Sequence, residues 1–122
     1  MRTASKAWAM LLLPALTLLY GCHSSHIDAT VENRTGAAIE LLEVDYPSAS
    51  FGADNLAAGA DYHYRLHVRL RGPVKVQYTD PSSHQVRQIT GPELAEGQEG
   101  RLEIVLLPAG KAEFHPDLSS NR

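Results

Sequence analysis

The sequence predicts an all-β domain, a single antiparallel β-sandwich of about seven short strands. Apolar and polar residues alternate with a period of two in several segments, as they do in strands that are buried on one face only. Turn-forming residues separate these segments at intervals of roughly 8–12 residues, which is typical of sandwiches. After position 22, no stretch of about 12 residues has the apolar periodicity of a helix.

Composition limits the size and the class of the protein. The 122 residues are enough for one domain with a modest core. Acidic residues number 14 against 11 Lys plus Arg, and the net charge of −3 excludes a nucleic-acid-binding protein that relies on bulk positive charge. The single Cys excludes an internal disulfide framework.

The first half of the domain contains two well-defined strands. Alternation over 27–32 predicts the first strand, and the turn-forming residues 33–36 predict a hairpin turn after it. A second strand is predicted over 37–46. Its apolar residues change phase near Leu41 and Leu42, which indicates either a β-bulge there or a strand covered on both faces.

The middle of the chain contains the clearest strand. Residues 48–52 predict a loop or a short edge segment, and 54–57 predict another brief strand. The strand predicted over 61–70 has an apolar face of Tyr62, Tyr64, Leu66, Val68 and Leu70 opposite a basic face of His63, Arg65, His67 and Arg69.

The remaining predicted strands cover 74–78, 84–90, 102–106 and 112–114. Residues 91–100 are polar and contain three Gly, so they predict a loop. A turn at 108–111 predicts a hairpin between the last two strands, and 115–122 predict a flexible tail. The β-sandwich domain is therefore expected over 27–114.

The N-terminus has the features of a secretory signal. Arg2 and Lys6 precede an apolar run over 7–20, which is too short to span a membrane comfortably. The run ends in Leu19-Tyr20-Gly21-Cys22. This ending resembles the lipobox of bacterial lipoproteins in its Leu, its small Gly and its Cys, whereas the bulky Tyr departs from the family's pattern.

The resemblance implies that residues 1–21 are a lipoprotein signal peptide and that Cys22 is acylated with diacylglycerol and becomes the first residue of the mature chain. Residues 22–26 would then be the lipidated Cys and a polar tether. His23, where the family's inner-membrane proteins carry Asp, implies sorting to the outer membrane, with the domain on the periplasmic or the surface face. Removal of Arg2 and Lys6 moves the net charge from −3 to −5.

The strand pattern of the domain resembles the small immunoglobulin-like or transthyretin-like sandwiches that bacterial lipoproteins carry. The resemblance implies a lipid-anchored envelope protein that acts as a non-enzymatic binding or assembly module, with the membrane and an envelope protein as partners. Two alternatives remain open: a domain that binds anionic glycans or lipids, and an accessory subunit of a secretion or transport complex that pairs through a strand edge.

The candidate ligand-binding residues form a basic row on the strand predicted over 61–70 and just beyond it. They are His63, Arg65, His67, Arg69, Arg71 and Lys75. Alternate side chains on one strand face stand about 6.6 Å apart, so the row would attract a polyanion. The alternative interpretation is that these cations pair with Glu40, Glu43 or Glu103 on neighbouring strands.

No catalytic or metal site is predicted. His63 and His67 would lie about 13 Å apart on a strand, too far to share a metal ion. No Ser lies in a nucleophile elbow, and no Gly-rich phosphate loop occurs. The sequence therefore predicts a protein that is not an enzyme, uses no cofactor and binds no nucleic acid.

Overall fold

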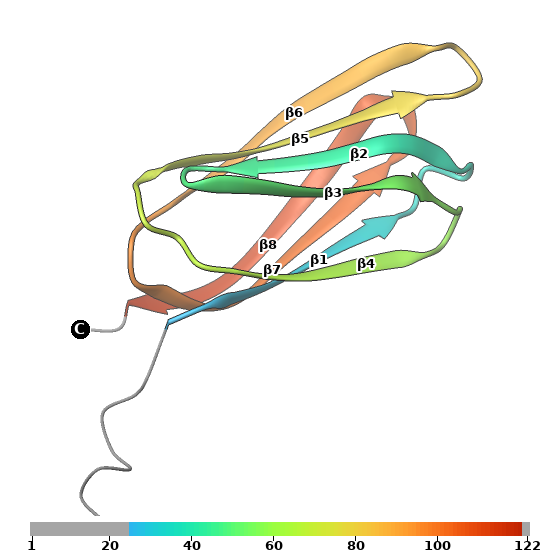
Figure 1. The fold of residues 1–122 in the computed structure, drawn as a ribbon. Helices are drawn as coiled ribbons and strands as arrows, with labels where there is room; N and C mark the ends of the chain where they lie inside the picture. Colours follow the sequence, from blue (N-terminus) through green and yellow to red (C-terminus); the bar gives the residue numbers. More distant parts are fainter. Residues whose placement is uncertain (1–24, 121–122) are drawn as a thin grey trace, which may run out of the picture.

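The computed structural model describes residues 25–120, which fold into two four-stranded sheets packed face to face (Figure 1). The strands are β1 (Ile27–Asn33), β2 (Ile39–Tyr46), β3 (Ala49–Leu56), β4 (Asp61–Leu66), β5 (Gly72–Asp80), β6 (Gln85–Leu94), β7 (Gln98–Leu107) and β8 (Lys111–Ser120). The predicted all-β sandwich is confirmed, with eight strands rather than about seven. The predicted signal peptide, Cys22 and the first residues of the tether lie outside the described residues.

The first sheet has the strand order β4-β1-β7-β8 and is mixed. β1 runs parallel to β7, in a register from Ile27 opposite Gly100 to Asn33 opposite Leu106. The prediction of an antiparallel sandwich is therefore wrong for this pair. The two strands are not joined by a hairpin, so no tight turn requires them to run in opposite directions.

The second sheet has the order β3-β2-β5-β6 and is antiparallel throughout. The register between β2 and β5 shifts between Glu40 and Glu43, which confirms the predicted bulge. Leu41 at the bulge has a φ of 51° and is 62% exposed. Gly52 packs against this stretch so closely that an added Cβ would clash with the Leu42 carbonyl oxygen, so a side chain cannot replace it.

The core lies between the two sheets and is built from their inward-facing aliphatic and aromatic residues. Every strand contributes to it or packs against it. Ile27, Val76, Leu94, Ile104 and Leu106 have no exposed surface. This alternation of buried and exposed positions is the one that the sequence predicts for most strands.

Two boundaries differ from the sequence prediction because the chain changes sheets. The predicted hairpin at 33–36 instead carries the chain from β1 to β2 in the opposite sheet. β4 ends at Leu66 rather than at residue 70, because residues 67–71 cross over to β5, and Leu70 is consequently 60% exposed.

Pairing also extends three other strands beyond their predicted ends. β6 and β7 take up most of the predicted loop over 91–100, leaving only residues 95–97 between them. β8 runs to Ser120 because it pairs with β7 along its whole length, so residues 115–120 are a strand where the sequence predicts a tail. The predicted hairpin between the last two strands is confirmed, with the short 3-10 helix η3 (Pro108–Gly110) as its turn. Among the described residues, no helix is long and apolar enough to cross a membrane.

Candidate functional site

The six predicted basic residues do not form one row in the structure. His63 and Arg65 lie on β4, at the edge of the first sheet. His67, Arg69 and Arg71 lie in the crossover between β4 and β5, and Lys75 lies on β5 in the second sheet. Whether any of them binds a ligand stays a prediction. We call His63 and Arg65 the β4 pair and His67, Arg69 and Arg71 the loop group, and Lys75 belongs to neither.

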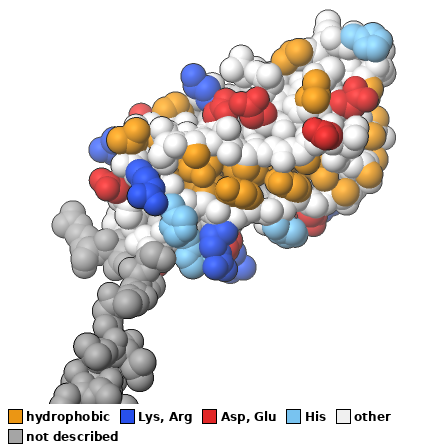
Figure 2. All heavy atoms as spheres, in the orientation of Figure 1, with side chains coloured by type: hydrophobic (Ala, Val, Ile, Leu, Met, Phe, Trp, Pro, Cys, Tyr) orange, Lys and Arg blue, Asp and Glu red, His pale blue; other side chains and the backbone are white. Residues whose placement is uncertain are grey.

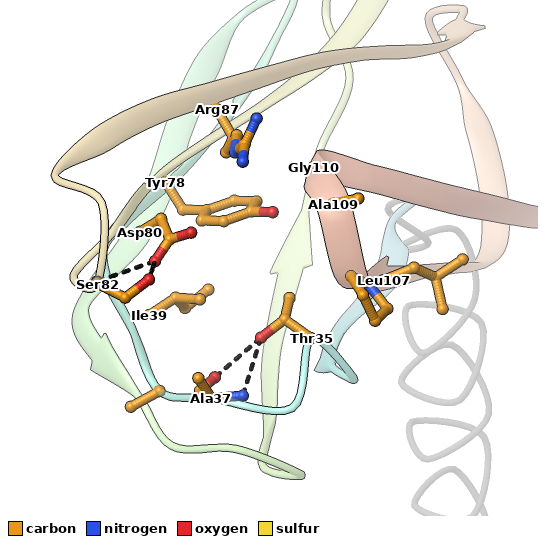
Figure 3. Close-up of a pocket in the computed structure, with 12 residues that line it drawn as sticks. Thr35, Ala37, Ile39, Tyr78, Asp80, Ser82, Arg87, Leu107, Ala109 and Gly110 are labelled. Carbon is orange, nitrogen blue, oxygen red and sulfur yellow. Dashed lines mark hydrogen bonds between the residues drawn. The ribbon is translucent and has the colours of Figure 1, made fainter.

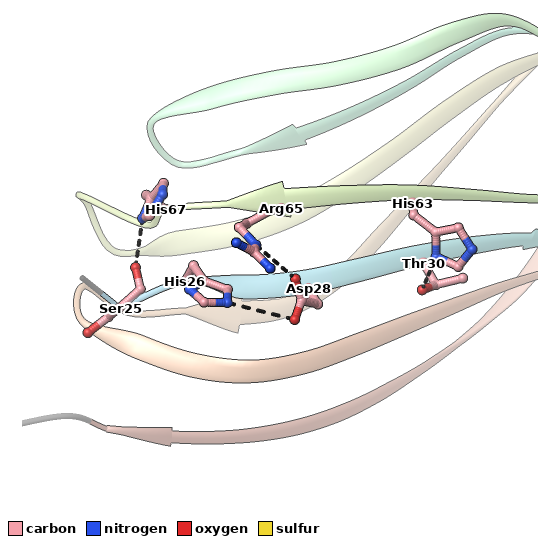
Figure 4. A network of polar contacts seen from close by, with 7 residues as sticks. All are labelled: Ser25, His26, Asp28, Thr30, His63, Arg65 and His67. Atoms are coloured by element: carbon pink, nitrogen blue, oxygen red, sulfur yellow. Dashed lines mark hydrogen bonds and ion pairs between the residues drawn. The ribbon is translucent and has the colours of Figure 1, made fainter. Parts of the chain in front are cut away.

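The β4 pair makes contacts with β1 across the outer face of the first sheet (Figure 4). Arg65 Nε lies 3.3 Å from Asp28 Oδ1, and His63 Nδ1 lies 3.0 Å from Thr30 Oγ1. These side chains border a shallow groove of about 290 Å³. The ion-pair interpretation therefore holds for Arg65, although its partner is Asp28 and not one of the glutamates named above.

The loop group surrounds the beginning of β1. His67 Nδ1 donates to the carbonyl oxygen of Ser25 at 2.7 Å, and the rings of His67 and His26 meet edge to face at 6.2 Å (Figure 4). Ser48 donates its hydroxyl proton to the carbonyl oxygen of His67 and accepts from the N–H of Arg69, each at 3.2 Å. The loop backbone is thus held to the neighbouring turn and to the start of the domain.

The tip of this loop is exposed and carries charge on both sides of an apolar side chain. Arg71 lies 3.3 Å from Glu93, but both side chains are largely exposed. Within residues 25–120, the Arg69 side chain takes part in no hydrogen bond or ion pair. Leu70, between the two arginines, has 60% of its surface exposed.

A cluster of rings at the edge of the core, which we call the aromatic edge, consists of Tyr46, Phe51, Tyr62 and Tyr64, of which Tyr46 and Phe51 are buried and Tyr62 is half-buried. The phase of the tyrosines in the sequence predicts core or core-edge positions for them. Phe51 stacks on Tyr64 with centroids 4.5 Å apart and on Tyr62 at 6.1 Å, and Tyr46 meets Phe51 at 6.2 Å. Tyr64 nevertheless remains 39% exposed.

The aromatic edge lies where β3 and β4, the outermost strands of the two sheets, come together. Figure 2 shows a row of hydrophobic side chains along this side of the molecule. Burial raises the pKa of Tyr46, so its hydroxyl stays protonated at neutral pH. Sequence reasoning missed this surface because Phe51 and Tyr64 belong to different sheets, and only their packing brings them together.

A pocket of about 170 Å³ opens between the turns at the end of the sandwich opposite the β4–β5 loop (Figure 3). Tyr78, Asp80 and Arg87 border it. Asp80 accepts hydrogen bonds from the Ser82 hydroxyl at 2.7 Å and the Ser82 N–H at 3.0 Å, and these bonds lower the pKa of Asp80. The hydrogen bonds between Ser82 and Asp80 are those of a turn, and no His is among the described residues that line the pocket.

Carboxyl groups also pair on the outer face of the first sheet. A hydrogen bond from Glu103 lowers the pKa of Glu32, with Arg34 adding to the effect at 2.6 Å, and the same bond together with the charge of Glu32 raises the pKa of Glu103. The described residues include no group of three or more His, Cys, Asp or Glu that could hold a metal ion. The pair is therefore a proton-sharing contact between neighbouring strands.

Comparison with known proteins identifies the fold only. No family model matches the chain, and no curated protein matches it. An NMR structure of a protein from Eubacterium rectale is similar, with a TM-score of 0.54 and 12% sequence identity, over 75% of this chain and 87% of that one. At this identity the likeness supports a two-sheet sandwich and says nothing about function.

Proposed function

We propose that the chain is a lipid-anchored protein of the bacterial cell envelope, sorted to the outer membrane, whose sandwich is a non-enzymatic binding or assembly module for a protein partner. The aromatic edge is the observation that carries the binding role. Tyr64 is exposed at this edge, with the half-buried Tyr62 beside it. Exposed aromatic residues are enriched where proteins meet, because a Tyr ring contributes a large apolar area and keeps a polar tip.

The strands beside these rings favour a protein partner over a small ligand. β3 and β4 are each paired on one side only, so their outer backbone groups are free of a sheet neighbour. Such an edge can accept a further strand, with apolar side chains supplying the rest of the interface. The accessory-subunit role in a secretion or transport complex is one form of this function.

The anchor is proposed from the lipobox-like residues that end at Cys22. The first described strand begins at Ile27, so only a short tether would separate the lipid from the folded domain. Fractionation of cells that produce the full chain or its Cys22→Ala variant tests this. We expect the variant to leave the membrane fraction, and its retention there would show that lipidation at Cys22 is wrong.

Site-specific photo-crosslinking in intact cells tests the binding role. A photoreactive phenylalanine at position 54 on β3 or at position 64 on β4 should capture the same protein. The matched control is position 86 on β6, at the opposite side of the sheet order and also exposed. Equal capture at 86, or different proteins at 54 and 64, would contradict a specific interface along the aromatic edge.

The alternative of an anionic glycan or lipid ligand is supported at fewer residues than the sequence predicts. Arg65 and Arg71 already have carboxylate neighbours, and Lys75 lies on the other sheet. His63, His67 and Arg69 are the other members of the basic row, and they remain without a carboxylate neighbour among the described residues. The likeness to immunoglobulin-like or transthyretin-like sandwiches also stays a prediction.

A further inference from the structure

The geometry points to the β4–β5 loop as a membrane-contact loop, in which Leu70 enters the headgroup region of the anchoring membrane while Arg69 and Arg71 bind anionic phospholipid headgroups. This inference rests on the proposed lipid anchor at Cys22 and adds a second, reversible contact between the domain and the bilayer. The ligand class is an anionic phospholipid surface.

The side chains of the loop have the chemistry of an interfacial segment. Val68 is 6% exposed and fixes the base of the loop in the core, whereas Leu70 two residues later is 60% exposed. An exposed Leu between two arginines suits a bilayer interface, because the Leu buries apolar area among the lipids while the arginines keep their charges at the headgroups. Leu70 is not among the residues of the hydrophobic core or those packed against it.

The position of the loop ties it to the anchor. His67 binds the carbonyl oxygen of Ser25, so the loop is fixed to the first described residue of the chain. Ser25 is three positions after Cys22 in the sequence, and three residues of extended chain span at most about 11 Å. A lipid on Cys22 would therefore keep Ser25, and the loop bound to it through His67, near the membrane surface, where charge attraction is effective.

Positively charged side chains gather at this end of the sandwich. Figure 2 shows Lys, Arg and His side chains gathered at the end of the sandwich where β1 begins. Carboxylates also occur here, but Asp28 and Glu93 lie beside Arg65 and Arg71, and the Arg69 side chain is left without an ion pair among the described residues. The loop thus combines the unpaired Arg69, the exposed Leu70 and Arg71, whose ion pair with Glu93 is largely exposed, so that an anionic headgroup can replace Glu93.

Fluorescence quenching by brominated lipids tests the inference in the full, lipidated chain. Removal of the signal peptide would remove Trp8, so Leu70→Trp places a single Trp at the loop tip of the lipidated chain. The matched control is Val86→Trp, which replaces another apolar residue that is 60% exposed, near the opposite end of the sandwich. The protein is reconstituted into vesicles of brominated phosphatidylcholine that contain about 30% phosphatidylglycerol, an anionic surface of the kind that attracts basic segments.

We expect the Trp at position 70 to be quenched severalfold more than the Trp at position 86. Equal quenching in protein that floats with the vesicles would overturn the loop contact and leave the anchor intact. Protein that fails to float would overturn the anchor itself and, with it, this inference. The two failures are therefore distinguishable in one experiment.

Charge reversal tests the lipid specificity. Arg69→Glu together with Arg71→Glu, in the Leu70→Trp chain, should lower the ratio of docked to undocked domain by at least about tenfold, since each Arg near an anionic surface is worth roughly fivefold. Vesicles without phosphatidylglycerol should have a similar effect. Unchanged quenching in both cases would overturn the role of anionic headgroups, and circular dichroism of each variant checks that the sandwich is folded.

Discussion

The two ends of the sandwich use polar residues in opposite ways. The distal end is formed by the turns at 33–38, 80–84 and 108–110. Its polar side chains form hydrogen bonds within the domain, and Asn33 is fully buried. At the tether end, formed by the turn at 47–48 and the loop at 67–71, charged side chains and Leu70 face solvent. The difference indicates that the distal end maintains the fold, whereas the tether end is available for contacts.

The largest expected effect tests the distal end. Asn33 Nδ2 donates to the carbonyl oxygens of Ala37, Leu56 and Ala57 at 2.8–3.1 Å, and its Oδ1 accepts from Thr35. Asn33→Ala would leave the buried Leu56 carbonyl and two partly buried carbonyls without this donor and should cost about 3 kcal/mol of unfolding free energy, measured by urea denaturation. Thr35→Ala, which removes one exposed partner only, should cost less. A loss below about 1 kcal/mol for Asn33→Ala would break the contrast between the two ends.

A smaller effect is expected at the next turn residue. Gly36 has a φ of 93°, and no atom lies within 4 Å of the place where a Cβ would stand. Gly36→Ala therefore introduces backbone strain without a clash and should cost about 1–2 kcal/mol in the same denaturation experiment. An unchanged free energy of unfolding would mean that this turn adapts freely and that the distal end is not rigid.

The pH dependence of thermal stability tests the distal end at Asp80, where we expect a still smaller effect on stability. The Ser82 hydroxyl and N–H lower the pKa of Asp80 below its ordinary value of 3.8. A carboxyl whose pKa is lower in the folded state stabilises the fold above its unfolded pKa, and this contribution is lost as the pH falls through the folded pKa. Asp80→Asn should therefore reduce the loss of thermal stability between neutral pH and about pH 3. The same dependence of thermal stability on pH in the parent chain and in Asp80→Asn would show that the Ser82 contacts do not favour the ionised form of Asp80.

The smallest effect on stability is expected at the tether end. Leu70→Ser changes an exposed side chain whose neighbours are solvated, so the free energy of unfolding should stay within about 0.5 kcal/mol of the parent chain. The same substitution should reduce membrane contact of the loop in the vesicle experiment. A stability loss as large as that of Gly36→Ala would show that Leu70 packs in the fold and would erase the difference between the two ends.

Local pattern predicted most of the strands because each alternation of apolar and polar residues reports burial on one face. The bulge at Leu41–Leu42 was visible as a change of phase for the same reason. The strand predicted over 61–70 failed at Leu66 because alternation continues in a loop that merely crosses between sheets, and a buried Val68 keeps the pattern while Leu70 breaks it. Periodicity records which side chains are apolar, and it does not record where the chain leaves a sheet.

The candidate surfaces show the same division. The basic residues were visible in the sequence, but their arrangement in a row was not determined by it, because the crossover after β4 sends Arg71 and Lys75 toward the second sheet. The aromatic edge joins Phe51 of one sheet to Tyr64 of the other, which no spacing along the chain predicts.

The sequence by itself determined the all-β class, the approximate number of strands, the turn chemistry and the lipobox-like end of the N-terminal segment, because each depends on residues that are close together along the chain. Only the tertiary structure decided that β1 lies parallel to β7, that β3 and β4 meet at an aromatic edge, and that Leu70 projects between two arginines beside the start of the domain. These features depend on how distant strands pair and how two sheets pack, and the free energy of such packing is shared among residues that local pattern cannot associate.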